Sequence, residues 1–194
     1  MSNLSTIVQE KLVFLNKFFR SPRQVGSITP SSKYLARAMV NSIPWERTQT
    51  AAELGAGTGA ITEHIKTSAA GRAQILLFET EASLREQLAR RYPEFSCHAD
   101  ACRIQSAMAQ LGIAHLDAIL SGLPFFNLPQ TTRAELMQHI ARSLKPGGHF
   151  VAFQYSLQMK PQLAELFDIE AIHFVPLNVP PAFVYVCRKR GGAQ

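Results

Sequence analysis

The 194-residue sequence lacks several features that would place it in a specialised class of protein. It contains no run approaching the roughly 20 apolar residues that a membrane-spanning helix needs, and no secretory signal pattern. Its three cysteines form no C-x-x-C pair, and its six histidines are scattered without the spacing of metal ligands. We therefore expect reduced thiols, no metal site and a cytoplasmic location.

Acidic residues are scarce in the first part of the chain. Residues 1–40 contain six Lys or Arg but a single acid, Glu10, so most of the formal net charge of +6 lies there. Residues 4–20 place aliphatic and aromatic side chains in one helical arc, with polar and basic side chains opposite. This pattern predicts an amphipathic helix that packs on the domain, binds an anionic membrane surface, or alternates between the two.

Three closely spaced glycines follow a short apolar stretch and precede a helical pattern. Gly55, Gly57 and Gly59 permit a tight strand-to-helix turn with positive φ, and they let a ligand approach bare backbone. The N-terminus of the helix that follows offers free N–H groups to an anion. Glu53 is a carboxylate at the end of a buried strand, where a specific partner is expected. The stretch is typical of a loop that binds a nucleotide-like ligand.

The rest of the sequence alternates short apolar strands with helical patterns. The alternation occurs five times, and two apolar runs at 171–175 and 182–187 follow without a full helix between them. This order predicts an α/β fold: a Rossmann-like, doubly wound seven-stranded sheet, mostly parallel with an antiparallel edge hairpin, preceded by N-terminal helices. We expect residues 1–44 to form a helical segment that acts as a lid for membrane or substrate, and residues 45–190 to form the catalytic domain.

Two local patterns predict where later elements begin. Thr132 and Glu135 have the spacing of a capping box, which predicts the start of a helix. The K-P-G-G sequence at 145–148 reads as a turn before a strand that runs from His149 to Tyr155.

Two kinds of ligand compete for the glycine loop. Gly55-x-Gly57-x-x-Ala60, with Glu79 about 20 residues further on, fits a dinucleotide fingerprint. The extra Gly59, the acid before the turn and the short chain argue against a dehydrogenase. The full set of E-x-G-x-G-x-G, an acid after the second strand, A-D-A at 99–101 and the K-P-G-G turn resembles the class I S-adenosylmethionine-dependent methyltransferases over about residues 45–190.

This resemblance implies how the cofactor would be held. Backbone around the glycines would bind the methionine part, Glu79 the ribose hydroxyls, and Asp100 the adenine amino group, with Ala101 contributing backbone. The cofactor-binding residues implied are Glu53, Gly55, Ala56, Gly57, Gly59, Glu79, Thr80, Asp100, Ala101 and Ser121. The structural alternatives are a helix cap for Glu79 and a turn residue for Asp100.

Segments on either side of the glycine loop carry the resemblance to a particular group of methyltransferases. The sequence at 25–32 resembles the V-G-x-x-x-P-S-S segment of bacterial phospholipid N-methyltransferases, that at 121–124 their S-G-L-P loop, and that at 178–182 their N-x-P-P-A segment. Gln154 matches their Q-x-T-Y segment only loosely, because Tyr155 follows it directly. The rRNA adenine dimethyltransferases share part of the pattern, but their fourth motif begins with Asn and they add a C-terminal helical domain.

The resemblance implies methyl transfer from S-adenosylmethionine to the amine of phosphatidylethanolamine, once or successively towards phosphatidylcholine. The enzyme would act as a peripheral protein at the inner face of the cell membrane, with residues 4–20 on the anionic surface and no nucleic-acid or obligate protein partner. The alternatives are an rRNA adenine N-methyltransferase and an N-methyltransferase of another aminolipid, such as ornithine lipid.

The residue that would accept the proton of the amine is not identified by the sequence. Residues implied to form the acceptor pocket are Ser121, Pro124, Phe125 and Tyr34. The candidates for a base by residue type are Tyr34, Tyr155 and His149, and those for binding a lipid phosphate are Arg20, Arg23, Lys33 and Arg188.

Overall fold

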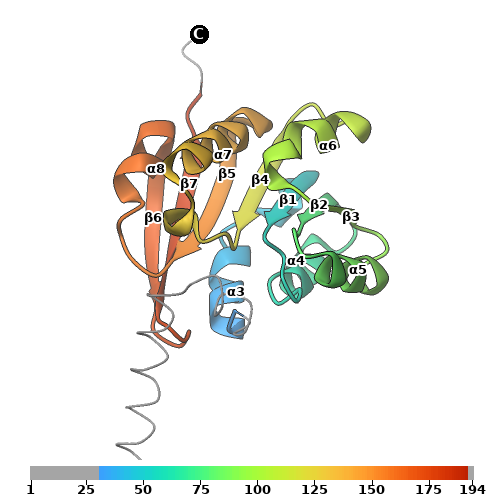
Figure 1. Ribbon diagram of the computed structural model, residues 1–194, viewed down its shortest axis with the longest axis horizontal. Helices are drawn as coiled ribbons and strands as arrows, with labels where there is room; N and C mark the ends of the chain where they lie inside the picture. Colours follow the sequence, from blue (N-terminus) through green and yellow to red (C-terminus); the bar gives the residue numbers. More distant parts are fainter. Residues whose placement is uncertain (1–30, 192–194) are drawn as a thin grey trace, which may run out of the picture. The chain divides into compact units, whose positions relative to one another are not determined.

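The computed structural model describes residues 31–191, which belong to one compact unit that begins at Ser31 (Figure 1). The amphipathic helix expected at 4–20 and most of the first acceptor motif, 25–30, lie outside the described residues.

A seven-stranded sheet, in the order β3-β2-β1-β4-β5-β7-β6, forms the centre of this unit. The strands are β1 Thr50–Leu54, β2 Gln74–Phe78, β3 Ser96–His98, β4 Leu116–Ser121, β5 Leu144–Gln154, β6 Phe167–Val175 and β7 Ala182–Lys189. The first five strands pair in parallel, and β7 runs antiparallel to both β5 and β6. The predicted fold is confirmed. Because the strand order reverses between β1 and β4, the carboxyl ends of these strands are where such a sheet binds ligands.

Helices cover both faces of the sheet (Figure 1). They are α3 Lys33–Val40, α4 Thr62–Ala69, α5 Ala82–Arg91, α6 Ile104–Gln110, α7 Gln130–Ser143 and α8 Lys160–Leu166, with short 3-10 turns η1 Trp45–Arg47, η2 Ala101–Arg103 and η3 Phe125–Asn127. The first three helices pack on one face and the last three on the other. Since both faces are buried, strands such as β2 read as continuous apolar runs in the sequence.

Helix α3 is built into the core. Ser32 caps the helix by accepting a hydrogen bond from the Leu35 N–H at 3.2 Å. Leu35 and Met39 are fully buried, and the indole N–H of Trp45 donates to the Val40 carbonyl at 2.9 Å. The part of the predicted N-terminal segment from α3 onward therefore packs as part of the α/β unit.

Two boundaries differ from those predicted. The capping box at Thr132 and Glu135 is wrong, because α7 begins at Gln130, directly after Pro129, and both residues lie inside the helix. The turn at 145–148 lies within the start of β5, where Gly147 has φ +73°. Leu116 of β4 pairs with Leu144 of β5, and Ala118, two residues later, pairs with His149. The extra residues of β5 between these pairs form a bulge in the strand.

Candidate cofactor and acceptor site

The glycine loop follows the carboxyl end of β1 and contains three residues at positive φ. Gly55, Gly57 and Gly59 have φ of +75°, +55° and +85°. A Cβ on Gly55 would lie 2.8 Å from a methyl carbon of Leu123, whereas a Cβ on Gly57 would meet nothing within 4 Å. The positive φ favours glycine at all three positions; a side chain at Gly55 would in addition displace Leu123, while the backbone at Gly57 borders open space.

Glu53 is completely buried beneath this loop. Its Oε2 accepts a hydrogen bond of 2.6 Å from the hydroxyl of Thr62, and its Oε1 has no partner among the described residues. Burial raises the pKa of Glu53 to about 8; the bond from Thr62 opposes this rise and the charge of Glu79 adds to it. The carboxyl group is therefore largely protonated at pH 7. Thr62 was not among the predicted site residues, although it opens the helix that follows the loop.

Glu79 connects the glycine loop to the start of α5. Its Oε2 accepts from the Gly57 N–H at 2.8 Å, and its Oε1 accepts from the Glu81 N–H at 2.9 Å. A carboxylate has about four acceptor positions, so two of them remain for a ligand. The second acid of the predicted set thus lies in direct contact with the loop.

The residues predicted to bind adenine lie at the same edge of the sheet. The Glu79 N–H donates to the His98 carbonyl at 3.0 Å, which joins the ends of β2 and β3. Asp100 follows two residues later, is exposed, and accepts from the Cys102 N–H at 2.8 Å. Thr80 is also exposed and Ala101 is half-buried. Asp100 therefore caps η2 with one oxygen and leaves the other free of backbone bonds.

The S-G-L-P loop follows β4 and touches the ends of both neighbouring strands. Ser121 is fully buried, and its hydroxyl accepts from the Leu123 N–H at 3.2 Å. The Gly122 N–H donates to the Leu54 carbonyl of β1 at 2.8 Å, and the Gln154 amide of β5 donates to the Leu123 carbonyl at 2.9 Å. This loop therefore lies between the glycine loop and the end of β5.

Asn178, in the turn between β6 and β7, joins the remaining acceptor motifs. Its Oδ1 accepts from the Ser32 N–H at 3.0 Å, and its amide donates to the Pro180 carbonyl at 2.7 Å. Burial raises the pKa of Tyr155, and a side-chain hydrogen bond with Asn178 opposes that rise. Segments at 32, 155 and 178 are thus held together at the carboxyl edge of the sheet.

Three of the predicted acceptor residues differ greatly in exposure. Pro124 is exposed, whereas Phe125 is 1% exposed and packs edge to face on Phe150, with ring centroids 6.1 Å apart. The ring of Phe125 thus belongs to the core, and its neighbour Phe126 is the exposed one. Tyr34 is also exposed, with the Lys33 ammonium 5.3 Å from its ring centroid.

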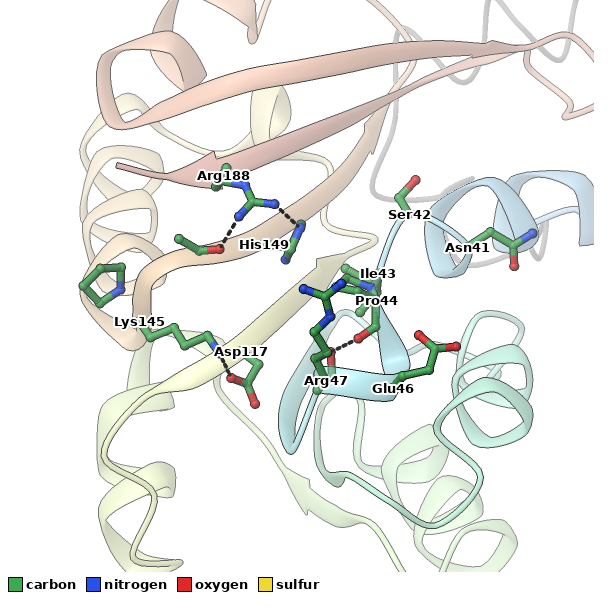
Figure 2. Close-up of a pocket in the computed structure, with 13 residues that line it drawn as sticks. Asn41, Ser42, Ile43, Pro44, Glu46, Arg47, Asp117, Lys145, His149 and Arg188 are labelled. Atoms are coloured by element: carbon green, nitrogen blue, oxygen red, sulfur yellow. Dashed lines mark hydrogen bonds and ion pairs between the residues drawn. The ribbon is translucent and has the colours of Figure 1, made fainter. Parts of the chain in front are cut away.

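His149 and Arg188 lie at the opposite edge, near the amino ends of the parallel strands. The Arg188 guanidinium approaches the His149 Nε2 at 3.2 Å, and both line a cavity of about 770 Å³ (Figure 2). Along β5, His149 is about 17 Å from Gln154. Arg47 and the ion pair between Lys145 and Asp117 also line this cavity. None of the predicted cofactor residues lines the cavity, so neither His149 nor Arg188 belongs to the candidate site.

Comparison with known proteins identifies the family. The profile of the family described as a methyltransferase domain matches residues 51–148, which include the glycine loop, Glu79 and Asp100. The chain belongs to the class I S-adenosylmethionine-dependent methyltransferases. It is 31% identical over 186 residues to the ornithine lipid N-methyltransferase of Singulisphaera acidiphila, covering 93% of this chain and 97% of the relative.

Solved methyltransferases share the fold of this one. The N-methyltransferase NodS from Bradyrhizobium japonicum, in complex with S-adenosylhomocysteine, is 15% identical with a TM-score of 0.62, covering 82% of this chain and 94% of NodS. The 1,6-didemethyltoxoflavin-N1-methyltransferase of Burkholderia thailandensis is 15% identical with a TM-score of 0.64, covering 98% and 92%. At these identities the likeness concerns the fold.

The methyl donor of this methyltransferase is S-adenosylmethionine, and the described residues fit such a ligand. The backbone at Gly57 borders open space, the buried Oε1 of Glu53 has no partner among the described residues, and Glu79 has acceptor positions to spare, which together suit a ligand with polar groups at this edge. Within residues 31–191, no cluster of three or more His, Cys, Asp or Glu could hold a metal ion. None of the helices in the described part is long and apolar enough to cross a membrane.

Proposed function

We propose that this methyltransferase methylates the amine headgroup of an aminolipid, and that ornithine lipid is a better candidate than phosphatidylethanolamine. The observation that carries this proposal is the 31% identity to an ornithine lipid N-methyltransferase over nearly all of both chains. Phosphatidylethanolamine remains the second candidate, because the motifs at 121–124 and 178–182 resemble those of phospholipid N-methyltransferases.

We assign the cofactor to the half of the carboxyl edge formed by β1, β2 and β3. When bound, S-adenosylmethionine supplies an electrophilic methyl group on a sulfonium, which a neutral amine can attack. The glycine loop and Glu53 would hold its methionine part, Glu79 its ribose and Asp100 its adenine. Ala56, Thr80 and Ala101 would contribute contacts beside these groups.

The acceptor amine would enter the other half of the edge, between the loops after β4 and β5. Because the sulfonium is an intrinsically good methyl donor, the main contribution of the protein is to position the amine in line with the methyl group. Ser121, which ends β4 beside the glycine loop, and Pro124 and Tyr34 are the residues that we place along this path. Phe125 would support the loop from the core.

The surroundings favour a neutral amine. None of the segments at 31–36, 122–129, 155–160 and 173–182 contains Asp or Glu. An amine that leaves water without meeting a carboxylate has a lowered pKa, so its lone pair becomes available. Since burial raises the pKa of Tyr155, the phenol stays protonated and serves as a hydrogen-bonding group. We therefore assign the released proton to solvent.

The test is a comparison of acceptors with labelled S-adenosylmethionine. The enzyme would be incubated with vesicles that contain ornithine lipid, with vesicles that contain phosphatidylethanolamine, and with RNA, and the products would then be separated. We expect label in the lipid fraction, mainly in ornithine lipid. Label in phosphatidylethanolamine alone would show that the acceptor headgroup is ethanolamine and not ornithine. Label in RNA, with a steep dependence on salt, would reject the proposal.

A further inference from the structure

The exposed large hydrophobic side chains of the described unit all lie on α3 or on segments at the carboxyl edge of the sheet. Six of them are between 45% and 61% exposed: Tyr34, Phe126, Leu157, Phe174, Leu177 and Val179. No other large hydrophobic side chain in residues 31–191 is comparably exposed. Single exposed apolar residues are ordinary, but a group of them gathered on one face indicates an interaction surface.

These six residues, which we call the apolar rim, surround the acceptor half of the carboxyl edge. Phe126 follows β4 and Leu157 follows β5, while the other four lie on α3 or on the end of β6 and the turn after it. The bond from Ser32 to Asn178 joins α3 to that turn. The bond from Gln154 to Leu123 joins the loops after β4 and β5. The apolar rim is therefore one continuous edge of the fold, although its residues are far apart in the sequence.

The distribution of charge at this edge also suits contact with lipid. The four segments that carry the apolar rim contain no carboxylate, whereas the cofactor half carries Glu79 and Asp100. Two of the aromatic rings have a cation beside them: Lys33 is 5.3 Å from the Tyr34 ring centroid, and Arg133 is 5.5 Å from that of Phe126. An aromatic body with a cation at its border suits the boundary between acyl chains and phosphate or carboxylate headgroups.

We propose that the apolar rim docks on a lipid bilayer, so that the acceptor half of the site meets the headgroups without the lipid leaving the membrane. This inference rests on the proposed function and adds a second membrane surface to the one predicted for residues 4–20. The apolar contact does not depend on anionic lipid, since it comes from burial of hydrophobic side chains. Each side chain that enters the acyl boundary strengthens partition by about tenfold or more.

The test uses the full chain and uncharged vesicles of phosphatidylcholine, on which attraction between opposite charges is weak. Leu177 is the most exposed member of the apolar rim. We expect Leu177→Ser to weaken co-sedimentation with vesicles by about tenfold, and Leu177→Glu to weaken it further. Gln110→Glu adds the same charge at an exposed position at the end of α6, outside the apolar rim, and should leave partition unchanged.

Unchanged partition of both Leu177 variants would overturn the proposal. A change in oligomeric mass without a change in partition would show that the apolar rim joins two copies of the chain. A loss of thermal stability alone would show that residues 1–30 cover it. Either result would also overturn the proposal.

Activity on a short-chain aminolipid below its critical micelle concentration separates this proposal from the proposed function. The Leu177 variants should methylate this monomeric lipid as wild type does, and should be slower than wild type only on vesicles. If wild type methylated no aminolipid at all, the proposed function would fail, while the vesicle measurement would still test the apolar rim.

Discussion

The buried carboxyl group of Glu53 gives the stability of the protein an unusual dependence on pH. Burial raises its pKa from the ordinary 4.5 to about 8, partly opposed by the bond from Thr62 and increased by the charge of Glu79. Between these two pKa values the folded state holds a proton that the unfolded chain has released. The unfolded state then binds fewer protons, so the free energy of unfolding falls as the pH rises through this range.

The substitution Glu53→Gln isolates this effect. The glutamine amide can still accept the 2.6 Å hydrogen bond from Thr62, but it cannot ionise. Relative to wild type, the free energy of unfolding of the variant should increase by about 1.4 kcal/mol for each pH unit inside this range. From pH 5 to pH 7 the difference should therefore grow by about 3 kcal/mol. It should level off above the folded-state pKa of about 8.

Urea unfolding followed by circular dichroism at pH 5, 6 and 7 would measure this difference. The measurements should be made without cofactor, because a bound cation would favour the ionised carboxylate. Glu63→Gln is the control, since it makes the same substitution at an exposed carboxylate, which pairs with Arg91 at 2.9 Å. A difference between Glu53→Gln and wild type that stays constant from pH 5 to pH 7 would refute the reasoning.

Three further predictions concern the two halves of the site and the N-terminal segment. Gly57→Val and Glu79→Ala should each weaken S-adenosylmethionine binding at least tenfold, or about 1.4 kcal/mol, as measured by calorimetry. The valine is strained at the positive φ of Gly57, and the alanine removes the carboxylate that accepts from the Gly57 N–H. Asn178→Ala removes the acceptor of the Ser32 N–H, so it should lower the free energy of unfolding by about 1–3 kcal/mol and raise KM for lipid, while cofactor affinity stays at the wild-type value. Deletion of residues 1–20 should reduce co-sedimentation with anionic vesicles to the level that the apolar rim alone supports on uncharged vesicles, and should preserve cofactor affinity; equal co-sedimentation of both proteins would reject the membrane role of this segment.

Much of the fold could be predicted because strands that are buried on both faces appear in the sequence as continuous apolar runs. The run at 75–78 is apolar throughout, and β2 occupies it. The start of α7 was harder to predict, since Pro129 allows the helix to begin before the Thr132 capping pattern. The start of β5 could not be predicted, because it is set by pairing with β4. Such pairing produces no local sequence pattern at Gly147.

The parts of the candidate site that follow from the order of the motifs could be predicted from the sequence. The parts that depend on local geometry could not. The glycine loop and Glu79 are in contact, as their positions after adjacent parallel strands imply. Phe125 and Phe126 are adjacent phenylalanines, and only the turn of η3 decides which ring enters the core. His149 is a candidate base by residue type, but it lies about 17 Å along β5 from Gln154 and lines a cavity that contains none of the predicted cofactor residues, which removes it from the site.

The antiparallel direction of β7 has a consequence for how this enzyme can change its acceptor. Because β7 runs opposite to β5, the turn before it reaches the same edge as the ends of the parallel strands. That turn carries Asn178 and three residues of the apolar rim lie on it or beside it, yet it shares no hydrogen bond with the glycine loop in the described part of the chain. On the proposed assignment, cofactor recognition and acceptor recognition are therefore carried by separate segments. Replacement of a single turn could give a relative a new headgroup specificity while its use of the methyl donor is inherited intact.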